Sequence, residues 1–248
     1  MKHILHPNIS GSSHQITVHL VGVGGTGSHV LTNLAMMSQA MAKIERQPLF
    51  VRAFDFDEVT ENNIGRQNFS PADIGENKAN VLINRINRFY GYQWQAEDMS
   101  YELFNGGSHM EPNIIISCVD SVKSRKEIAS TWLNRKSAPY WMDIGNSTRK
   151  AQIILGADTL GRDPESAGCR NVLSDFFAEY PGVKDDPNDD TPSCSALASL
   201  NRQDLFINKI VASYATHMLW TLLKDYMIDY RGMYINLETL QTNKIPIL

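Results

Sequence analysis

Cysteine is scarce in this sequence of 248 residues. Only Cys118, Cys169 and Cys194 are present, and no two of them form a C-x-x-C pair. Structural zinc sites and disulfide frameworks need several regularly spaced cysteines, so we expect neither zinc nor disulfides. The scarcity also indicates a reducing compartment, and we expect a cytoplasmic protein.

Long apolar runs are missing as well. The best candidate for a membrane helix, residues 206–223, is interrupted by Asn208, Lys209 and His217. It therefore predicts a helix of a soluble protein and no membrane span. The opening MKHILHPNISGSSHQ is polar and broken by proline and glycine, which is unlike a secretion signal.

A surplus of basic charge is also absent. Lys and Arg number 23 against 27 Asp and Glu, which gives a formal net charge of −4. Proteins that bind nucleic acids in general usually present a basic face to the phosphates. We therefore expect no nucleic-acid partner.

The apolar pattern alternates between strands and helices. Strands are expected at residues 16–21, 49–54, 113–119, 140–144 and 150–155, and helices at 28–43, 78–89 and 123–134. This alternation predicts an α/β fold with a Rossmann-like, mostly parallel sheet flanked by helices. The length suits one domain, with a nucleotide-binding core at residues 16–155.

Residues 156–204 have a different composition. They are rich in Asp, Pro, Gly and Ser and include the run KDDPNDDTPSCS. A connection this long without a helix or strand pattern is usually functional or mobile. We expect a long irregular crossover here, followed by a C-terminal part (205–248) with a helix at 205–226 and a strand at 233–240.

A glycine-rich loop joins the first expected strand to the first expected helix. Gly22, Gly24 and Gly27 form G-x-G-x-x-G within HLVGVGGTGSHV. Glycine lets the backbone approach phosphate oxygens, and the helix N-terminus attracts them. The motif alone does not choose among NAD, FAD, S-adenosylmethionine and ATP.

Four charged residues downstream favour ATP. Asp55 ends the second strand, where dinucleotide folds place an acidic residue on the ribose. Arg66 and Lys78 are cations that a dehydrogenase does not need, whereas an enzyme that splits ATP must stabilise a leaving pyrophosphate. Asp120 ends the strand NIIISCVD, where a carboxylate is a natural Mg²⁺ ligand. The alternative for Asp55 is a loop carboxylate, and the alternative for Arg66 and Lys78 is that each is a surface cation. The alternative for Asp120 is a helix N-cap.

The motifs together resemble a known family. GVGGTGS, DFDEVTENNIGRQ, IGENK and SCVDSVKSR follow one another as in the ThiF/MoeB and ubiquitin-activating-enzyme adenylation family. The resemblance covers about residues 17–155. The segments TPSCSALASLNRQDLFINK and YINLETLQTNKIPI are most similar to the ThiF-type member of the ParB-related, ThiF-related cassette (PRTRC system) of mobile elements.

The resemblance implies activation of a carboxylate. Mg²⁺ and ATP lie over the glycine loop, and the C-terminal carboxylate of a small ubiquitin-like or sulfur-carrier protein attacks the α-phosphorus. Asp55 holds the ribose, Asn63 and Arg66 contact phosphates, Lys78 stabilises pyrophosphate, and Asp120 binds Mg²⁺. The nucleotide-binding residues are then Gly22, Gly24, Gly25, Gly27, Asp55, Asp57, Asn63, Arg66 and Lys78. The family also implies a homodimer.

Cys194 lies close to where family members place a cysteine that takes the acyl group as a thioester; an ordinary loop cysteine is the alternative. The chain departs from many relatives because no arginine precedes Arg46. In those relatives an N-terminal arginine reaches across the dimer to the partner's ATP. Two other functions stay open: a catalytically silent nucleotide-binding scaffold, which the missing arginine favours, and an NAD(P)-dependent oxidoreductase.

Overall fold

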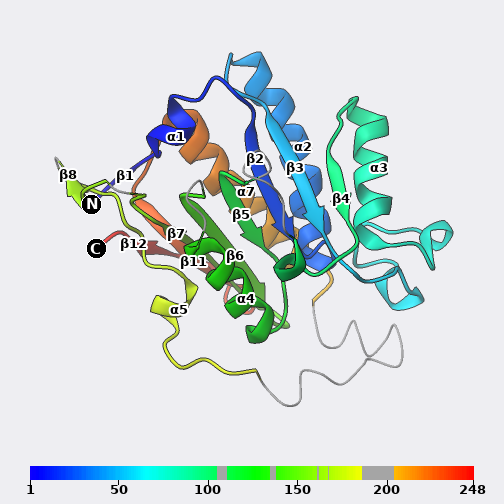
Figure 1. The fold of residues 1–248 in the computed structure, drawn as a ribbon. Coiled ribbons are helices and arrows are strands. Elements are labelled where there is room, and N and C mark those ends of the chain that lie inside the picture. Colours follow the sequence, from blue (N-terminus) through cyan, green and yellow to red (C-terminus); the bar gives the residue numbers. More distant parts are fainter. Residues whose placement is uncertain (105–110, 135–137, 161, 167, 186–203) are drawn as a thin grey trace.

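A mixed sheet of eight strands forms the centre of the molecule in the computed structural model, which describes residues 1–104, 111–134, 138–160, 162–166, 168–185 and 204–248 (Figure 1). The strands are β2 (Ile16–Val21), β3 (Leu49–Phe54), β4 (Gln95–Glu97), β5 (Ile114–Ser117), β6 (Tyr140–Asn146), β7 (Lys150–Ala157), β11 (Tyr230–Asn236) and β12 (Gln241–Pro246). Their order across the sheet is β12-β11-β7-β6-β5-β2-β3-β4. The five strands from β6 to β4 run parallel, and the other three are antiparallel to their neighbours. The predicted α/β fold with a mostly parallel sheet is confirmed.

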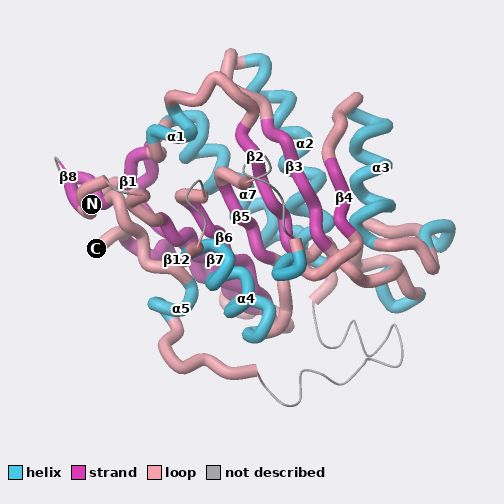
Figure 2. Tube along the Cα trace, viewed as in Figure 1, coloured by secondary structure: helices cyan, strands magenta, loops and turns pink. Residues whose placement is uncertain are grey.

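Helices cover both faces of this sheet (Figure 2). On one face α2 (Gly25–Lys43) packs along α7 (Ile207–Asp225), and α3 (Lys78–Tyr90) lies beside α2. The other face carries α4 (Val122–Leu133) and the short α5 (Phe176–Glu179). Burial of the apolar side of each helix against the sheet explains this layering.

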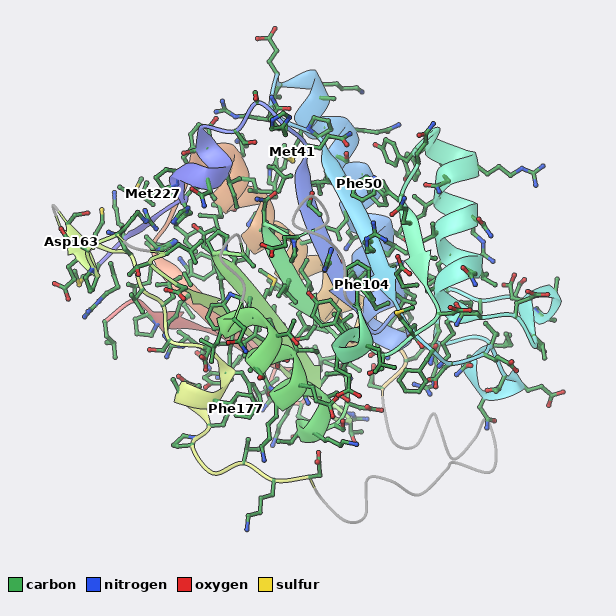
Figure 3. The ribbon with its side chains drawn as sticks, viewed as in Figure 1. Met41, Phe50, Phe104, Asp163, Phe177 and Met227 are labelled. Carbon is green, nitrogen blue, oxygen red and sulfur yellow. The ribbon has the colours of Figure 1, made fainter. Side chains whose placement is uncertain are left out.

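Each face has its own apolar core. The larger core joins sheet residues such as Val18 to Leu34 of α2 and Leu219 of α7. The smaller core lies under α4 and α5, where Figure 3 labels Phe177. It contains Trp141, whose ring centroid is 6.1 Å from that of Phe177. None of the described helices is long and apolar enough to cross a membrane.

The register of the parallel strands brings their carboxyl ends to one edge. Val21 of β2 pairs with Phe54 of β3 and with Ser117 of β5, and Ser117 pairs with Asp143 of β6. The loops that follow these strands are residues 22–24, 55–57 and 118–121. They leave the sheet at the same level, where open α/β sheets bind their ligands.

The C-terminal strand differs from its prediction. The pattern predicts one strand at residues 233–240, whereas the chain forms a hairpin in which β11 ends at Asn236 and β12 begins at Gln241. Of the β12 residues only Ile245 is buried. A strand that exposes almost every side chain gives no period-two apolar signal, which explains the miss.

Two histidines fasten the N-terminal segment to the rest of the molecule. Strand β1 (His3–Ile4) pairs with β10 (Met227–Ile228). The His3 Nδ1 lies 2.7 Å from the Arg170 carbonyl oxygen, and the His3 Nε2 lies 2.9 Å from the Tyr140 hydroxyl. The hydroxyl also accepts from the His6 backbone N–H at 2.7 Å. The Arg170 carbonyl can only accept, so Nδ1 carries a proton. Burial lowers the pKa of His3 to about 4, which keeps the ring neutral near pH 7 and leaves Nε2 to accept from the Tyr140 hydroxyl.

Candidate functional site

The glycine loop is shaped by contacts that only glycine permits. Gly22 has φ +83°, and a Cβ there would lie 2.9 Å from the Cys118 carbonyl oxygen. A Cβ on Gly27 would lie 1.9 Å from the Gly22 carbonyl oxygen. Gly24 is the N-cap of α2 and offers no capping side chain, so the first N–H groups of the helix are available to an anion.

Asp55 links the end of β3 to this loop. Its Oδ2 accepts a hydrogen bond from the Val23 N–H at 2.8 Å, and its Oδ1 accepts from the Asp57 N–H at 3.0 Å. Burial raises the pKa of Asp55, while the nearby Lys78 and these two hydrogen bonds oppose the rise. A carboxylate oxygen with one bond still has a lone pair, so both oxygens can accept from ribose hydroxyls.

Lys78 joins Asp55 and Asp57 in one cluster. It is the first residue of α3, after the N-cap Asn77, and only 8 % of it is exposed. Its Nζ lies 2.7 Å from Asp57 Oδ2. An ammonium group has three donors, so pairing with Asp57 leaves hydrogens for a phosphate.

The turn that carries Arg66 lies against the glycine loop. A Cβ on Gly24 would be 3.7 Å from Gln67 Oε1, and Asn68 Nδ2 donates to the Ser28 carbonyl at 3.1 Å. Arg66 is half-buried, and burial lowers the pKa of its guanidinium. Asn63 is buried and its Oδ1 accepts from the Thr60 N–H at 2.8 Å. That oxygen therefore stabilises the turn.

Asp120 lies in the loop between β5 and α4, whose residue Cys118 touches Gly22. Ser121 is the N-cap of α4 and accepts from the Ser124 N–H at 3.1 Å. Asp120 is therefore not the cap, which removes one alternative for it. Its side chain is exposed.

The surroundings of Asp120 fit a magnesium ion that is held mainly by phosphates. Among the described residues, no group of three His, Cys, Asp or Glu side chains could form a complete metal site. Mg²⁺ commonly uses one or two carboxylates together with substrate phosphates and waters. A single exposed carboxylate in the loop next to the glycine loop meets that requirement.

A buried polar network below this loop was not predicted from the sequence. Arg125 Nε lies 3.0 and 3.1 Å from the two carboxylate oxygens of Asp143. Asp143 also accepts from the Ser117 hydroxyl at 2.7 Å, and that hydroxyl accepts from Trp141 Nε1 at 2.8 Å. Burial raises the pKa of Asp143, and Arg125 and Ser117 oppose the rise. The one sign of this network in the sequence is the charged Asp143 inside the apolar run YWMDIG.

Both described ends of the crossover meet the same edge. Asp185 accepts hydrogen bonds from the Val122 and Lys123 N–H groups at the start of α4. At the other end, the Asp204 N–H donates to the Thr148 carbonyl at 2.8 Å. Cys194 lies outside the described residues, so its role stays a prediction.

The C-terminal helix supports the glycine loop. Asn208, in the first turn of α7, is buried, and its Oδ1 lies 2.9 Å from the Thr26 hydroxyl of α2. The same hydroxyl lies 3.0 Å from Asn146 Oδ1 at the end of β6. A Cβ on Gly25 would come within 2.9 Å of Asn208, so Gly25 permits close packing of the two helices.

The other two cysteines show no features of a nucleophile. Cys118 follows β5 directly, and burial raises the pKa of its thiol. Cys169 is buried in β9 (Cys169–Arg170). A thiolate nucleophile needs access and a lowered pKa.

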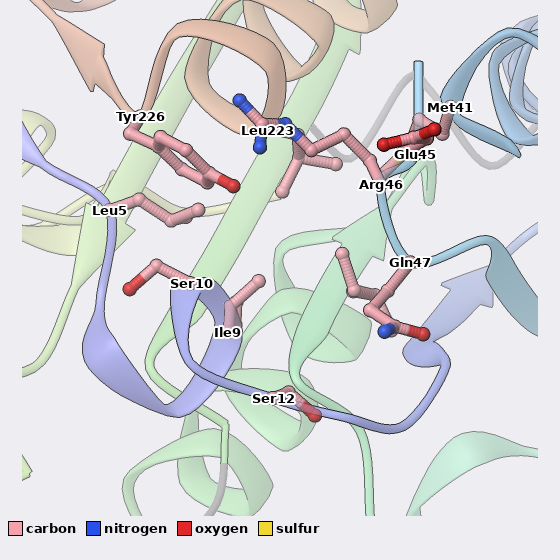
Figure 4. Close-up of a pocket in the computed structure, with 11 residues that line it drawn as sticks. Leu5, Ile9, Ser10, Ser12, Met41, Glu45, Arg46, Gln47, Leu223 and Tyr226 are labelled. Carbon is pink, nitrogen blue, oxygen red and sulfur yellow. The ribbon is translucent and has the colours of Figure 1, made fainter. Parts of the chain in front are cut away.

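A pocket of about 130 Å³ lies far from this edge (Figure 4). Its lining includes Ile16, at the start of β2, and Met41, near the end of α2. Arg46 lies 4.2 Å above the ring centre of Tyr226 on its wall. The pocket is at the opposite end of β2 from the glycine loop, so it is separate from the candidate nucleotide site.

Comparisons with known proteins agree with the fold. The profile of the ThiF family matches residues 12–244. No curated protein matches the sequence.

Among solved structures, PaaA is similar at 17% identity and a TM-score of 0.64, covering 94% of this chain and 64% of that one. Escherichia coli MccB with ATP is similar at 14% identity and a TM-score of 0.60, covering 96% and 66%. MccB with MccA is similar at 14% identity and a TM-score of 0.59, covering 97% of this chain and 66% of that one. The chain thus spans about two thirds of each of these proteins, and identities this low show a shared fold alone.

Proposed function

The chain belongs to the ThiF family, whose members are generally adenylyltransferases, and we propose that it uses Mg²⁺ and ATP to adenylate a carboxylate. The carboxylate is the C-terminus of a small ubiquitin-like or sulfur-carrier protein. MccB, a structural neighbour, has been crystallised with ATP and with MccA, which supports this kind of chemistry in the fold.

One observation carries the proposal. The glycine loop is held on three sides by groups from distant parts of the sequence: Asp55 through Val23, Gln67 against Gly24, and Cys118 against Gly22. Lys78 reaches the same cluster through Asp57. An NAD(P)-dependent oxidoreductase gives no reason for a buried lysine and a half-buried arginine beside the phosphate loop.

In the proposed reaction, a carboxylate oxygen forms a bond to the α-phosphorus and the bond from that phosphorus to the bridging oxygen of the β-phosphate breaks. Pyrophosphate leaves and an acyl-adenylate is formed. A carboxylate nucleophile carries no proton to remove, so catalysis consists of positioning and charge stabilisation. Lys78 and Arg66 stabilise the negative charge on pyrophosphate, and Asp55 orients the ribose.

Mg²⁺, when bound, would neutralise charge shared between the phosphates. Asp120 would hold it, since its carboxylate is exposed next to the loop and is not needed as a helix cap. The glycine loop and the residues that hold it would keep the phosphates over the N-terminus of α2.

Several finer features remain part of the proposal. In a second step the Cys194 thiolate would attack the acyl carbon of the acyl-adenylate, the bond from that carbon to the phosphate oxygen would break, and AMP would leave as the thioester forms. Two copies would form a homodimer. The similarity of the C-terminal segments favours a role in the PRTRC system. These features rest on sequence resemblance.

The first test measures ATP–pyrophosphate exchange in the presence of candidate small proteins with exposed C-terminal tails. Removing one group that stabilises transition-state charge typically lowers the rate by about 10²–10³. We expect Arg66→Ala and Asp120→Ala to lose exchange by this factor. Arg88→Ala, which removes an exposed arginine of α3, is the matched control and should retain the rate.

The alternatives give different results. Full exchange in both site variants would refute the assigned residues. Nucleotide binding without exchange for any partner would favour a silent scaffold. Binding of a nicotinamide cofactor that is independent of Mg²⁺ would favour an oxidoreductase.

A further inference from the structure

Arg125 connects a buried carboxylate to the loop that carries Asp120. Its Nε bonds both oxygens of Asp143, and its Nη1 donates to the Asp120 main-chain carbonyl at 3.1 Å. Arg125 is 6 % exposed and Asp143 is 1 % exposed. The guanidinium therefore links β6 directly to the backbone of Asp120.

Further contacts restrict where this guanidinium can lie. Its carbon lies 5.1 Å from the ring centre of Phe176, and a Cβ on Gly145 would lie 3.0 Å from Nη2. Asp143 is itself held by Ser117, the last residue of β5. Two neighbouring strands and α5 thus fix the arginine before it reaches the loop.

A buried pair of this kind contributes little to folding when compared with well-packed apolar residues, because both ions lose their hydration. Such a pair can instead fix geometry, since the planar fork of arginine binds two acceptors in set directions. Here the second acceptor is the backbone of the residue that would hold the metal.

We infer that Asp143 and Arg125 are positioning residues that set the location of the Asp120 carboxylate for a divalent cation bound with the nucleotide. The inference rests on the proposed function, because Asp120 has a ligand only if Mg²⁺ and ATP bind at this edge. Neither residue contacts the reacting atoms. The pair acts through the main chain of the loop between β5 and α4.

Arg125→Lys is the sharpest variant. Lysine keeps the positive charge beside Asp143 but lacks the fork that reaches both acceptors. The chain also offers a matched control, because the buried Arg231 pairs with Glu179 and donates to the Ser174 carbonyl at 3.2 Å. Arg231→Lys makes the same chemical change in a pair that holds α5 but does not reach the Asp120 carbonyl, so it also controls for a weakened α5.

Two readouts test the inference on the full chain. The first is the Kd of Mn²⁺ measured by electron paramagnetic resonance in the presence of α,β-methylene-ATP. Loss of a residue that orients a metal ligand typically weakens metal binding about 10–100-fold. We expect this factor for Arg125→Lys, with unchanged affinity for the nucleotide without metal, and no change for Arg231→Lys.

The second readout is amide hydrogen exchange of a peptide that spans residues 118–124, measured without nucleotide or metal. Exchange in this peptide should be faster in Arg125→Lys than in the wild type and unchanged in Arg231→Lys. This readout does not depend on the proposed function. If the wild type binds no Mn²⁺ with the nucleotide, the proposed metal site fails while the exchange result still decides whether the pair holds the loop.

A variant that combines Asp143→Leu with Arg125→Met provides for the case in which Arg125→Lys fails to fold. Replacing a buried ion pair by apolar side chains of similar size commonly preserves folding. It should show the same weak Mn²⁺ binding and faster exchange. Mn²⁺ affinity within twofold of wild type, or equal losses in Arg231→Lys, would overturn the inference.

Discussion

At the scale of single residues, side chains of the candidate site also hold the site together. Asp55 bonds two backbone N–H groups, and Asn63 closes its own turn. Substituting such a residue removes a structural contact together with the proposed ligand contact. Asp120 differs, because Ser121 caps the helix in its place. Its substitution is therefore the cleaner test of chemistry.

His3 should make folding stability depend on pH. Burial lowers the pKa of His3 from 6.5 to about 4. Because the folded-state pKa is lower, the unfolded chain binds more protons between these values. The contribution of His3 is then complete above about pH 6.5 and is lost as the pH falls towards 4. We expect a loss of about 2 kcal/mol between pH 7.5 and pH 5.

Urea denaturation at pH 7.5 and pH 5 measures this contribution. In His3→Gln the difference in unfolding free energy between the two pH values should shrink by about 2 kcal/mol. His14→Gln replaces an exposed histidine and should show the wild-type difference. If the difference in unfolding free energy between the two pH values is as large in His3→Gln as in the wild type, then His3 binds its proton as strongly in the folded chain as in the unfolded chain.

At the scale of elements, the predicted helices and strands lie within a few residues of their expected ends, except for the C-terminal strand. The first predicted helix begins at Gly25, three residues before the predicted Ser28. Gly25, Thr26 and Gly27 already belong to the helix, although two of them are glycines of low helix propensity. Apolar spacing predicts such elements well, since burial on one side decides them. It did not predict the Arg125–Asp143 pair, because a sequence does not show which distant side chains meet.

The junction of the glycine loop and α2 should not tolerate a methyl group at Gly27. The added carbon would lie 1.9 Å from the Gly22 carbonyl oxygen, so the loop or the helix must move. Overpacking of this kind costs about 1–3 kcal/mol and sometimes more. We expect Gly27→Ala to lower the melting temperature and to abolish nucleotide binding in calorimetry.

Gly11→Ala is the control for this change. Gly11 has φ −98°, which alanine also adopts, and a Cβ there would lie 3.2 Å from the Pro7 carbonyl oxygen. The variant should keep nucleotide affinity. Normal nucleotide binding by Gly27→Ala would contradict the geometry of the loop.

At the scale of the whole molecule, the β11–β12 hairpin closes the sheet at the edge opposite β4, several strands away from β2. Ile245 is buried at 5 % exposure, whereas Thr242 on the same strand is exposed. Removing a large aliphatic side chain from a core costs about 2–5 kcal/mol. Ile245→Ala should therefore lower the unfolding free energy by this amount, and Thr242→Ala should change it little.

Nucleotide affinity separates stability from function in this pair of variants. Below the melting temperature, Ile245→Ala should bind ATP as the wild type does, because β7, β6 and β5 separate the hairpin from β2 and its glycine loop. Weaker binding by the folded variant would mean that the far edge of the sheet influences the site.

The anchoring of the crossover has a kinetic consequence. Asp185 is tied to the start of α4, and Asp204 is tied to the β6–β7 turn that follows Asn146. Any group carried by the residues between these anchors is tethered to the rim of the candidate site on both sides. A tether turns an encounter between two molecules into one within a molecule. A reactive group carried there would compete with water and free thiols for the product formed at the candidate site, and it would not first have to bind from solution.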